Sequence, residues 1–314
     1  MNVLFCGAGD QAAIYSPVLR ELSDSLNVPF TLFTDPADIA PTEVDVLVAN
    51  PNADVQDFGV YRGAKLIQSI WAGMEVFLVN PTLPSEPTLC RMVEPGLTEG
   101  MTDYICAHAL RHHVGLDKHI QDSANGVWDA AAPPLSHDRR VGVLGLGELG
   151  RDAAAMLAAL RFDVMGWSRN TKDGMPFPTR HGADGLREVL SRSEIIVTIL
   201  PNTPETHHLI NSDTLSLMPK GACIINPGRG SLIDDQALIA ALDAGHLGHA
   251  TLDVFDQEPL PDDHPLWRRP DVTITPHIAA ETRTRGAAKV VVEQIGRLQK
   301  GEALHYMVDR EVGY

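Results

Sequence analysis

The sequence has little of what marks a membrane-spanning, secreted or nucleic-acid-binding protein. No apolar run approaches the roughly 18–20 residues that a membrane span needs. The N-terminus enters an apolar run at once, without the basic region of a signal peptide. The 25 lysines and arginines face 41 aspartates and glutamates, so the formal net charge is -16 and no basic surplus exists to neutralise phosphates. We therefore expect a cytoplasmic protein with no membrane and no nucleic acid among its partners.

Cysteine is also scarce, and nothing in the sequence resembles a metal site. The chain has four cysteines without metal-type spacing, Cys6, Cys90, Cys106 and Cys223. Most of them lie in apolar runs, as reduced core residues do. The helical pattern of residues 101–121 carries His108 and His112 four residues apart, but no third ligand of suitable spacing is evident. An exposed helix face is the favoured interpretation, and we expect no metal.

The order of apolar runs predicts the fold class. With 314 residues, the chain is long enough for two domains. Strand-length runs alternate with helical patterns, which predicts parallel α/β sheets. The runs in the first half are residues 3–6, 31–33, 46–49, 66–70 and 77–80. Those in the second half are residues 141–144, 163–167, 195–200, 223–226, 249–253 and 272–275. Residues 125–138, between the halves, are polar and contain prolines, as a connecting or dimer-contacting segment does.

One turn has the composition of a dinucleotide site. Residues 145–150 read Gly-Leu-Gly-Glu-Leu-Gly, directly after an apolar run and directly before an alanine-rich helical pattern. Such glycines let the backbone approach a pyrophosphate, and the helix N-terminus offers N–H groups and a positive dipole end. This context predicts dinucleotide binding. The similar turn at residues 6–10 lacks the third glycine, and we interpret it as structural.

The next strand end indicates which dinucleotide. In NAD-binding units an acidic residue, about 20 residues further on, accepts hydrogen bonds from the ribose. Here Ser168 takes that place, followed by Arg169, with Lys172 close by. A carboxylate would repel a 2′-phosphate, whereas a hydroxyl and two cations would bind it. We predict NADP(H) in preference to NAD(H). The alternative is that the two cations are solvated loop residues.

Three polar residues follow three successive strands of the second half. Arg229 suits a substrate carboxylate or carbonyl oxygen as a fixed cation. His277, when protonated, could protonate a carbonyl oxygen as a hydride arrives. Glu258 could orient that ring and stabilise its charged form. Ligands bind at the carboxyl ends of strands in such sheets, so we expect these three residues to lie at the active site. Their chemistry fits the reduction of a 2-keto acid.

The chain resembles the D-isomer-specific 2-hydroxyacid dehydrogenases over almost its whole length, and within them the bacterial glyoxylate/hydroxypyruvate reductases. The stretches that carry the resemblance are residues 143–150, 200–203, 226–230, 252–260, 265–267 and 275–280. The resemblance implies two Rossmann-like or flavodoxin-like parallel-sheet domains with the active site in the cleft between them. The substrate-binding domain would be discontinuous, residues 1–103 and 283–314, and the dinucleotide-binding Rossmann domain would be residues 104–282.

The resemblance also assigns residues to roles. The catalytic set falls on Arg229, Glu258 and His277. The substrate-carboxylate loop falls on Trp71, Ala72 and Gly73, where Trp71 departs from the smaller residue usual in the family. Together with the glycine loop, the residues expected at the cofactor are Gly145, Gly147, Glu148, Leu149, Gly150, Ser168, Arg169, Lys172, Leu200, Pro201 and Asp253. A homodimer is implied, with residues 101–134 in the dimer contact.

These assignments predict NADPH-dependent reduction of small 2-keto acids such as glyoxylate and hydroxypyruvate. The alternatives are another member reaction, with a different substrate or a preference for NAD, or a non-catalytic NAD(P)-sensing protein. Corepressors on this fold retain the three catalytic residues, so those residues alone do not exclude a sensor. Turnover of 2-keto acids separates the two classes.

Overall fold

The chain divides into two compact units. The computed structural model describes residues 1–53, 55 and 57–311. One unit is Met1–Leu97 with Thr282–Tyr314, and the other is Thr98–Glu281. The first boundary expected from the sequence, after residue 103, lies inside α3 (Pro95–His113), whereas the division falls near the beginning of that helix. The second unit is thus inserted into the first.

The first unit contains a five-stranded parallel sheet in the order β2-β1-β3-β4-β5. The strands are β1 (Asn2–Cys6), β2 (Thr31–Phe33), β3 (Val46–Ala49), β4 (Leu66–Ser69) and β5 (Thr88–Cys90). This is one of the two common doubly wound strand orders. Every residue of β3 and β4 is buried, as expected when helices or loops cover both faces of a parallel sheet.

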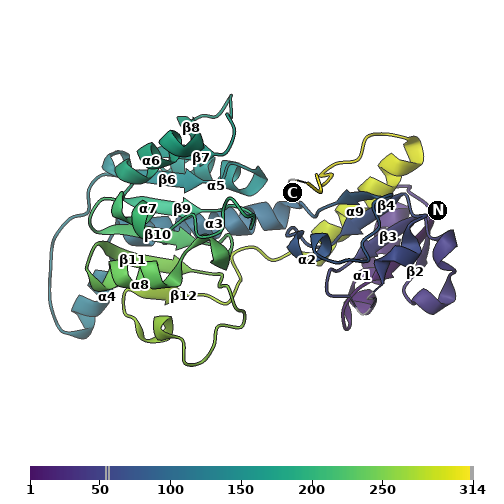
Figure 1. Cartoon of the computed structure of the whole chain (residues 1–314), viewed down its shortest axis with the longest axis horizontal. Coiled ribbons are helices and arrows are strands. Elements are labelled where there is room, and N and C mark those ends of the chain that lie inside the picture. Colours follow the sequence, from purple (N-terminus) through teal and green to yellow (C-terminus); the bar gives the residue numbers. More distant parts are fainter. Residues whose placement is uncertain (54, 56, 312–314) are drawn as a thin grey trace. The chain divides into compact units, whose positions relative to one another are not determined.

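Helices from both ends of the chain cover this sheet. Helix α1 (Gln11–Ser25) packs against the C-terminal helix α9 (Thr284–Lys300), which ends at Gly301 with a positive φ. Figure 1 shows α9, in yellow, beside the strands of the first unit. The short helix α2 (Glu75–Leu78) contributes Phe77 to the core of the other face. The expected strand at residues 77–80 was therefore wrong. A short apolar run has the same periodicity signal in a buried helix turn as in a strand.

The second unit contains a seven-stranded parallel sheet in the order β12-β11-β10-β9-β6-β7-β8. Its strands are β6 (Arg140–Leu144), β7 (Asp163–Ser168), β8 (Thr179–His181), β9 (Ile195–Thr198), β10 (Ala222–Asn226), β11 (Leu247–Leu252) and β12 (Val272–Ile274). The two sheets confirm the predicted fold class, although β5 and β8 were not expected. The chain leaves β6 toward β7 and returns to β9 on the opposite side, so a topological switch point lies between β6 and β9.

Helices cover both faces of the second sheet. One core contains side chains from α6 (Gly182–Arg192), α7 (Ser212–Ser216) and α8 (Asp235–Asp243). The other contains side chains from α3 and α5 (Glu148–Ala159). Small residues such as Ala153 and Ala154 let α5 lie close to the strands. This double covering leaves the carboxyl ends of the strands as the edge where loops can form a site.

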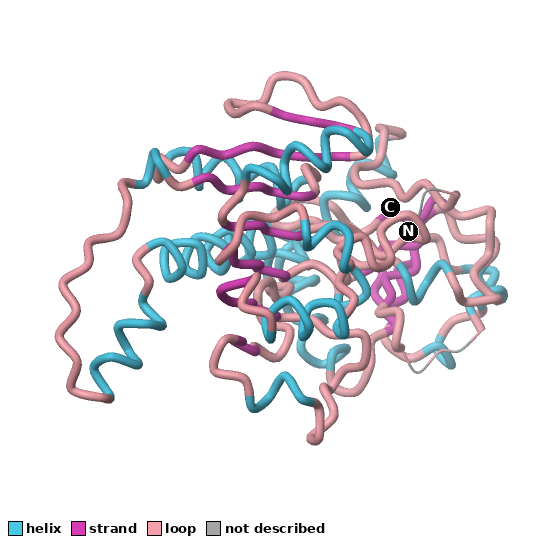
Figure 2. Tube along the Cα trace, turned by 60° about the vertical axis from the view of Figure 1, so that its left-hand side comes forward, coloured by secondary structure: helices cyan, strands magenta, loops and turns pink. Residues whose placement is uncertain are grey.

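The connection between α3 and β6 departs from the sequence prediction. One long helix was expected over residues 101–121, but the helix ends at His113, and α4 (Leu116–Ala124) begins after Gly115, which has a φ of +67°. That left-handed conformation suits glycine and interrupts the helix. Figure 2 shows α4 and the long loop that follows it lying apart from the strands of the unit.

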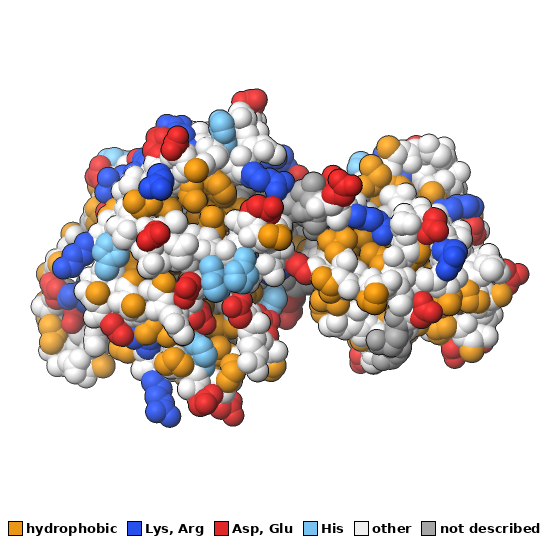
Figure 3. Space-filling view, viewed as in Figure 1, with side chains coloured by type: hydrophobic (Ala, Val, Ile, Leu, Met, Phe, Trp, Pro, Cys, Tyr) orange, Lys and Arg blue, Asp and Glu red, His pale blue; other side chains and the backbone are white. Residues whose placement is uncertain are grey.

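The described helices and the visible surface add two observations. Among the residues that the structure describes, no helix combines the length and the apolar character needed to cross a membrane. Acidic and basic side chains are intermingled on the face of each unit visible in Figure 3.

Candidate active site

The glycine loop joins β6 to α5 at the switch point of the second sheet. Gly145 has a φ of +110°, and a Cβ placed on it would lie 2.3 Å from the carbonyl oxygen of Ile199. A Cβ on Gly150 would lie 2.0 Å from the carbonyl oxygen of Gly145. Both positions therefore require glycine, because any side chain would push the backbone apart.

Gly147 differs from its two neighbours in the motif. A Cβ on this residue would meet no atom of the described chain within 4 Å. It is the N-cap of α5, so it lies where the helix presents its first N–H groups. The space and the dipole together suit an anionic group such as a pyrophosphate. Glu148 and Leu149 form the first turn of α5 beside it.

The residues expected to select the dinucleotide lie at the end of β7. Ser168 is buried, and its hydroxyl donates to the carbonyl oxygen of Asn170 at 2.6 Å, which fixes the turn. Arg169 and Lys172 follow on the exposed side of that turn. Glu205 has a pKa below its usual value, because its own backbone amide and Thr203 donate to it and because Arg169 is close. The loops after β7 and β9 therefore bring a cation and a carboxylate near each other.

Leu200 and Pro201 belong to the loop after β9. Thr206 donates its hydroxyl hydrogen to the carbonyl oxygen of Pro201 at 2.6 Å and accepts from the amide of Thr203 at 2.9 Å. The side chain of Leu200 lies within 3.2 Å of the Cβ position of Gly145. This loop therefore borders the glycine loop, on the β9 side of the switch point.

Arg229 follows β10 in a loop held by Asn226. The buried side chain of Asn226 donates to the carbonyl oxygen of Arg229 at 2.9 Å and accepts from Thr198 at 2.8 Å. The guanidinium donates through Nη1 to the carbonyl oxygen of Gly228 at 2.7 Å. Asn226 was not expected as a support of Arg229. Its signal is a polar residue that ends an otherwise apolar buried strand.

Glu258 and His277 come together at the edge of the second sheet, as predicted. Nδ1 of His277 lies 2.7 Å from Oε2 of Glu258, and the amide of Phe255 donates to the other carboxylate oxygen at 2.9 Å. A Cβ on Gly230 would lie 2.0 Å from the carbonyl carbon of Phe255, so the loop of Arg229 is in close contact with the loop that leads to Glu258. His277 has 51% of its side chain exposed and is accessible to a substrate.

Asp253 was expected at the nicotinamide, and its observed contacts are with the protein. The residue is fully buried, and its carboxylate accepts from the amides of Ile278 and Ala279 and from the hydroxyl of Thr275, at 2.9, 2.8 and 2.5 Å. It thus organises the loop that carries His277. The expected contact with the nicotinamide stays a prediction.

The predicted carboxylate loop lies in the first unit, after β4. Ser69 Oγ accepts from the amide of Trp71 and donates to its carbonyl oxygen, each at 2.9 Å. Within the described part of the chain, the N–H groups of Ala72 and Gly73 donate no hydrogen bond. Trp71 is 36% exposed. The turn thus presents two backbone donors that a carboxylate could use.

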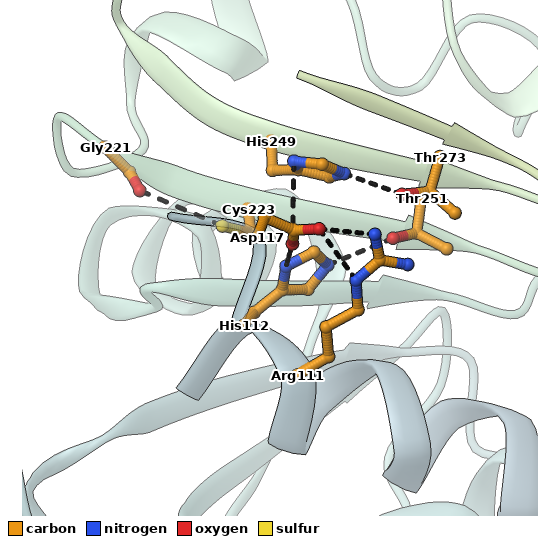
Figure 4. Close-up of polar contacts among 8 residues, drawn as sticks. All are labelled: Arg111, His112, Asp117, Gly221, Cys223, His249, Thr251 and Thr273. Carbon is orange, nitrogen blue, oxygen red and sulfur yellow. Dashed lines mark hydrogen bonds and ion pairs between the residues drawn. The ribbon is translucent and has the colours of Figure 1, made fainter. Parts of the chain in front are cut away.

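His112 of α3 has a buried side chain and forms a cluster with His249 of β11 and Asp117, which corrects the exposed helix face expected for it. Nδ1 of His112 and Nδ1 of His249 in β11 each lie 3.9 Å from Oδ2 of Asp117 (Figure 4). The other ring nitrogen of each histidine is hydrogen-bonded to a threonine hydroxyl, His112 to Thr251 and His249 to Thr273. Burial and the neighbouring ring of His249 lower the pKa of His112 to about 3. The described residues include no group of three or more histidine, cysteine or acidic side chains arranged for a metal ion. The cluster attaches the beginning of α4 to the sheet.

Comparison with known proteins places this geometry in a family. Residues 106–279 match the family described as D-isomer specific 2-hydroxyacid dehydrogenase, NAD binding domain. A D-isomer specific 2-hydroxyacid dehydrogenase from Xanthobacter autotrophicus Py2, in complex with NADPH and MES, is 34% identical with a TM-score of 0.92. An NADPH-dependent glyoxylate/hydroxypyruvate reductase from Sinorhizobium meliloti, in complex with NADP and sulfate, is 30% identical with a TM-score of 0.88. Each match covers 100% of this chain and 99% of the other.

A third solved structure agrees with these two. It is a probable 2-hydroxyacid dehydrogenase from Rhizobium etli CFN 42 with NADP, HEPES and L(+)-tartaric acid, 30% identical over 100% of this chain and 99% of that one, with a TM-score of 0.87. The family match covers more than half of the present chain, and the structural matches cover all of it. The chain belongs to the D-isomer specific 2-hydroxyacid dehydrogenase family.

Proposed function

We propose that this NAD(P)-dependent 2-hydroxyacid dehydrogenase reduces small 2-keto acids with NADPH, and that glyoxylate and hydroxypyruvate are its substrates. The observation that carries the proposal is the ion-pair geometry of His277 with Glu258. The two residues lie at the carboxyl ends of the strands of the second sheet, where the glycine loop also lies. The 30% identity to the Sinorhizobium meliloti reductase supports the choice of substrates.

The hydrogen bond between His277 and Glu258 defines which nitrogen can act on a substrate. An ionised carboxylate only accepts hydrogen bonds, so Nδ1 of His277 carries a hydrogen toward Oε2 of Glu258. Nε2 is then the atom that donates a proton to the carbonyl oxygen. A nicotinamide cofactor, when bound, would supply the hydride that the carbonyl carbon receives. Glu258 stabilises the charged ring before the proton leaves and keeps its orientation.

Two further groups would bind the acid. Arg229 presents a cation whose position is set by Gly228 and Asn226. The amides of Ala72 and Gly73 would receive the substrate carboxylate, a task for which the turn after β4 has two backbone donors. Trp71 beside them would limit the size of the group that the substrate carries on its carbonyl carbon.

The proposed preference for NADPH rests on the strand end at Ser168. Ser168, Arg169 and Lys172 at the end of β7 supply a hydroxyl and two cations in place of a carboxylate. The related structures from Xanthobacter, Sinorhizobium and Rhizobium were each obtained with NADPH or NADP. Open space at Gly147, with tight packing at Gly145 and Gly150, suits the pyrophosphate of such a cofactor.

Removal of Arg169 tests this preference. The Arg169→Ala enzyme should show a KM for NADPH raised by roughly 10- to 100-fold, because a charged hydrogen bond to the 2′-phosphate contributes about 1.5–3 kcal/mol. The KM for NADH should change less than about twofold, since NADH has no 2′-phosphate. The matched control is Arg187→Ala, which removes an exposed arginine of α6. Equal changes for the two cofactors would refute the assignment of Arg169.

The same assays separate the alternative functions. The wild-type enzyme is given glyoxylate, hydroxypyruvate and a panel of larger 2-keto acids, each with both cofactors. A larger acid as the best substrate, or NADH as the better reductant, would point to a different reaction of the family. Saturable NADPH binding without turnover of any 2-keto acid would identify a sensor.

We propose that the enzyme is a homodimer that uses the segment of α4 and residues 125–135. Large apolar side chains are exposed along it, including Ile120 at 58%, Trp128 at 96% and Leu135 at 64%. Exposed apolar surface of this kind is typical of an interaction site. Light scattering should give twice the chain mass of 34.1 kDa, and Ile120→Glu should lower that mass, whereas Val60→Glu in the first unit should not. A wild-type monomer would contradict the proposal.

A further inference from the structure

We infer that Tyr104 and Thr275 form a part-buried hydrogen-bonded relay that, through Asp253, holds His277 in its active conformation. Tyr104 and Thr275 would then be positioning residues for the reduction. The inference rests on the proposed function of His277 as the proton donor.

The backbone at His277 needs to be held. Its φ is +55°, in the left-handed region that residues with a Cβ adopt at a cost in free energy. Such a conformation persists only where the surroundings fix it. The amide of His277 donates to the carbonyl oxygen of Asp253 at 2.8 Å, and this is the first of the bonds that fix the loop.

The carboxylate of Asp253 provides the next bonds. It is fully buried and accepts from the two amides that follow His277, those of Ile278 and Ala279. A buried carboxylate is stable only when donors satisfy it, so its position depends on every donor around it. The third donor is the hydroxyl of Thr275, 2.5 Å from Oδ1.

The chemistry of the groups sets the direction of the relay. Because an ionised carboxylate can only accept, the hydroxyl hydrogen of Thr275 points at Asp253. The oxygen of Thr275 is then an acceptor for Tyr104, whose hydroxyl lies 2.7 Å away. Burial raises the pKa of Tyr104, which keeps the phenol protonated as a donor. Each hydroxyl thus donates to the next group, and the chain ends at the carboxylate.

Tyr104 lies on a helix that also packs on the same loop. It belongs to α3, whose neighbouring Met101 and Ile105 share a core with Ala279. A Cβ on Gly100 of this helix would lie 3.3 Å from the carbonyl oxygen of Ala279. The helix therefore contacts the His277 loop through backbone packing at one turn and through the Tyr104 hydroxyl at the next.

Removal of the relay should displace His277 without removing it. Thr275→Val, which keeps the shape of the side chain, should lower kcat by roughly 10- to 100-fold, because small misplacements of a catalytic group have effects of this size. The KM for NADPH should stay within about twofold. Thr275→Ser restores the hydroxyl and should recover most of kcat. Tyr104→Phe should lower kcat by roughly 3- to 10-fold, since the last donor to Asp253 remains.

The matched control is Thr273→Val in β12. It removes another part-buried threonine hydroxyl, one that pairs with His249 and not with Asp253, and should leave kcat within about twofold of wild type. Loss of kcat in this control equal to that in Thr275→Val would overturn the inference, because the effect would then come from the strand and not from the relay.

Amide hydrogen exchange tests the relay without a substrate. In Thr275→Val the amides of Ile278 and Ala279 should exchange at least roughly 10-fold faster than in the wild type, while Thr273→Val leaves them unchanged. Unchanged exchange together with unchanged kcat would overturn the relay. Faster exchange in a protein whose wild type turns over no 2-keto acid would reject the proposed function and still support the positioning of the loop.

Discussion

Replacing His277 by alanine is expected to lower kcat by roughly 10²- to 10⁴-fold, with the Kd for NADPH unchanged within about twofold. A positioned proton donor contributes a factor of this size, and His277 is the group whose ring nitrogen lies against Glu258 at 2.7 Å. The proposed cofactor site is elsewhere, at the glycine loop and the end of β7, so the affinity for NADPH should not depend on the imidazole. Steady-state turnover and fluorescence titration with NADPH measure the two quantities.

Two further variants complete this test. Glu258→Gln keeps the size of the side chain but removes the charge that favours the protonated ring, and it should lower kcat while the Kd for NADPH stays unchanged. His137→Ala is the matched control, because His137 is an exposed histidine of the same unit with 66% of its side chain accessible. A His277→Ala enzyme that retained wild-type turnover would remove His277 from the mechanism.

The strand-end residues show how much of the site could be predicted from the sequence. Arg229, Glu258 and His277 follow three neighbouring strands, and parallel strands bring their carboxyl ends to one end of a sheet. The glycine loop could be found in the same way, because its spacing has a direct physical reason. These residues could be proposed from the sequence since the signal is local: a polar residue in the loop that follows a periodic apolar run.

The supports of these residues could not be predicted, because they depend on contacts between distant segments. Thr275 and Tyr104 are 171 positions apart in sequence, and only the fold brings their hydroxyls together. Asp253 was expected to bind the cofactor. The three hydrogen bonds that its carboxylate accepts come from the loop after β12, so they are evident only from the folded structure. The burial of His112 could not be predicted for the same reason. Its burial follows from the packing of α3 against β11, which no helical periodicity reveals.

Loss of the guanidinium of Arg229 is the second change with a large expected effect. Arg229→Ala should lower kcat/KM for glyoxylate by roughly 10- to 150-fold, because a hydrogen bond to a charged group contributes about 1.5–3 kcal/mol and each 1.4 kcal/mol is tenfold. The Kd for NADPH should change little, as the residue lies after β10 and the glycine loop after β6. Arg229→Lys should restore only part of the loss, since an ammonium cannot replace a planar fork of donors.

The way this loss divides between the two kinetic constants shows which oxygen Arg229 binds. If it binds the substrate carboxylate, the contact is equally strong in the ground state and the transition state, and the loss appears as a raised KM with kcat unchanged. If it binds the carbonyl oxygen, where negative charge develops as the hydride arrives, the loss appears in kcat. Arg268→Ala, at an exposed site of the same unit, is the control. A kcat/KM within threefold of wild type for Arg229→Ala would exclude both assignments, and the acid would then have to be held by the backbone amides after β4 alone.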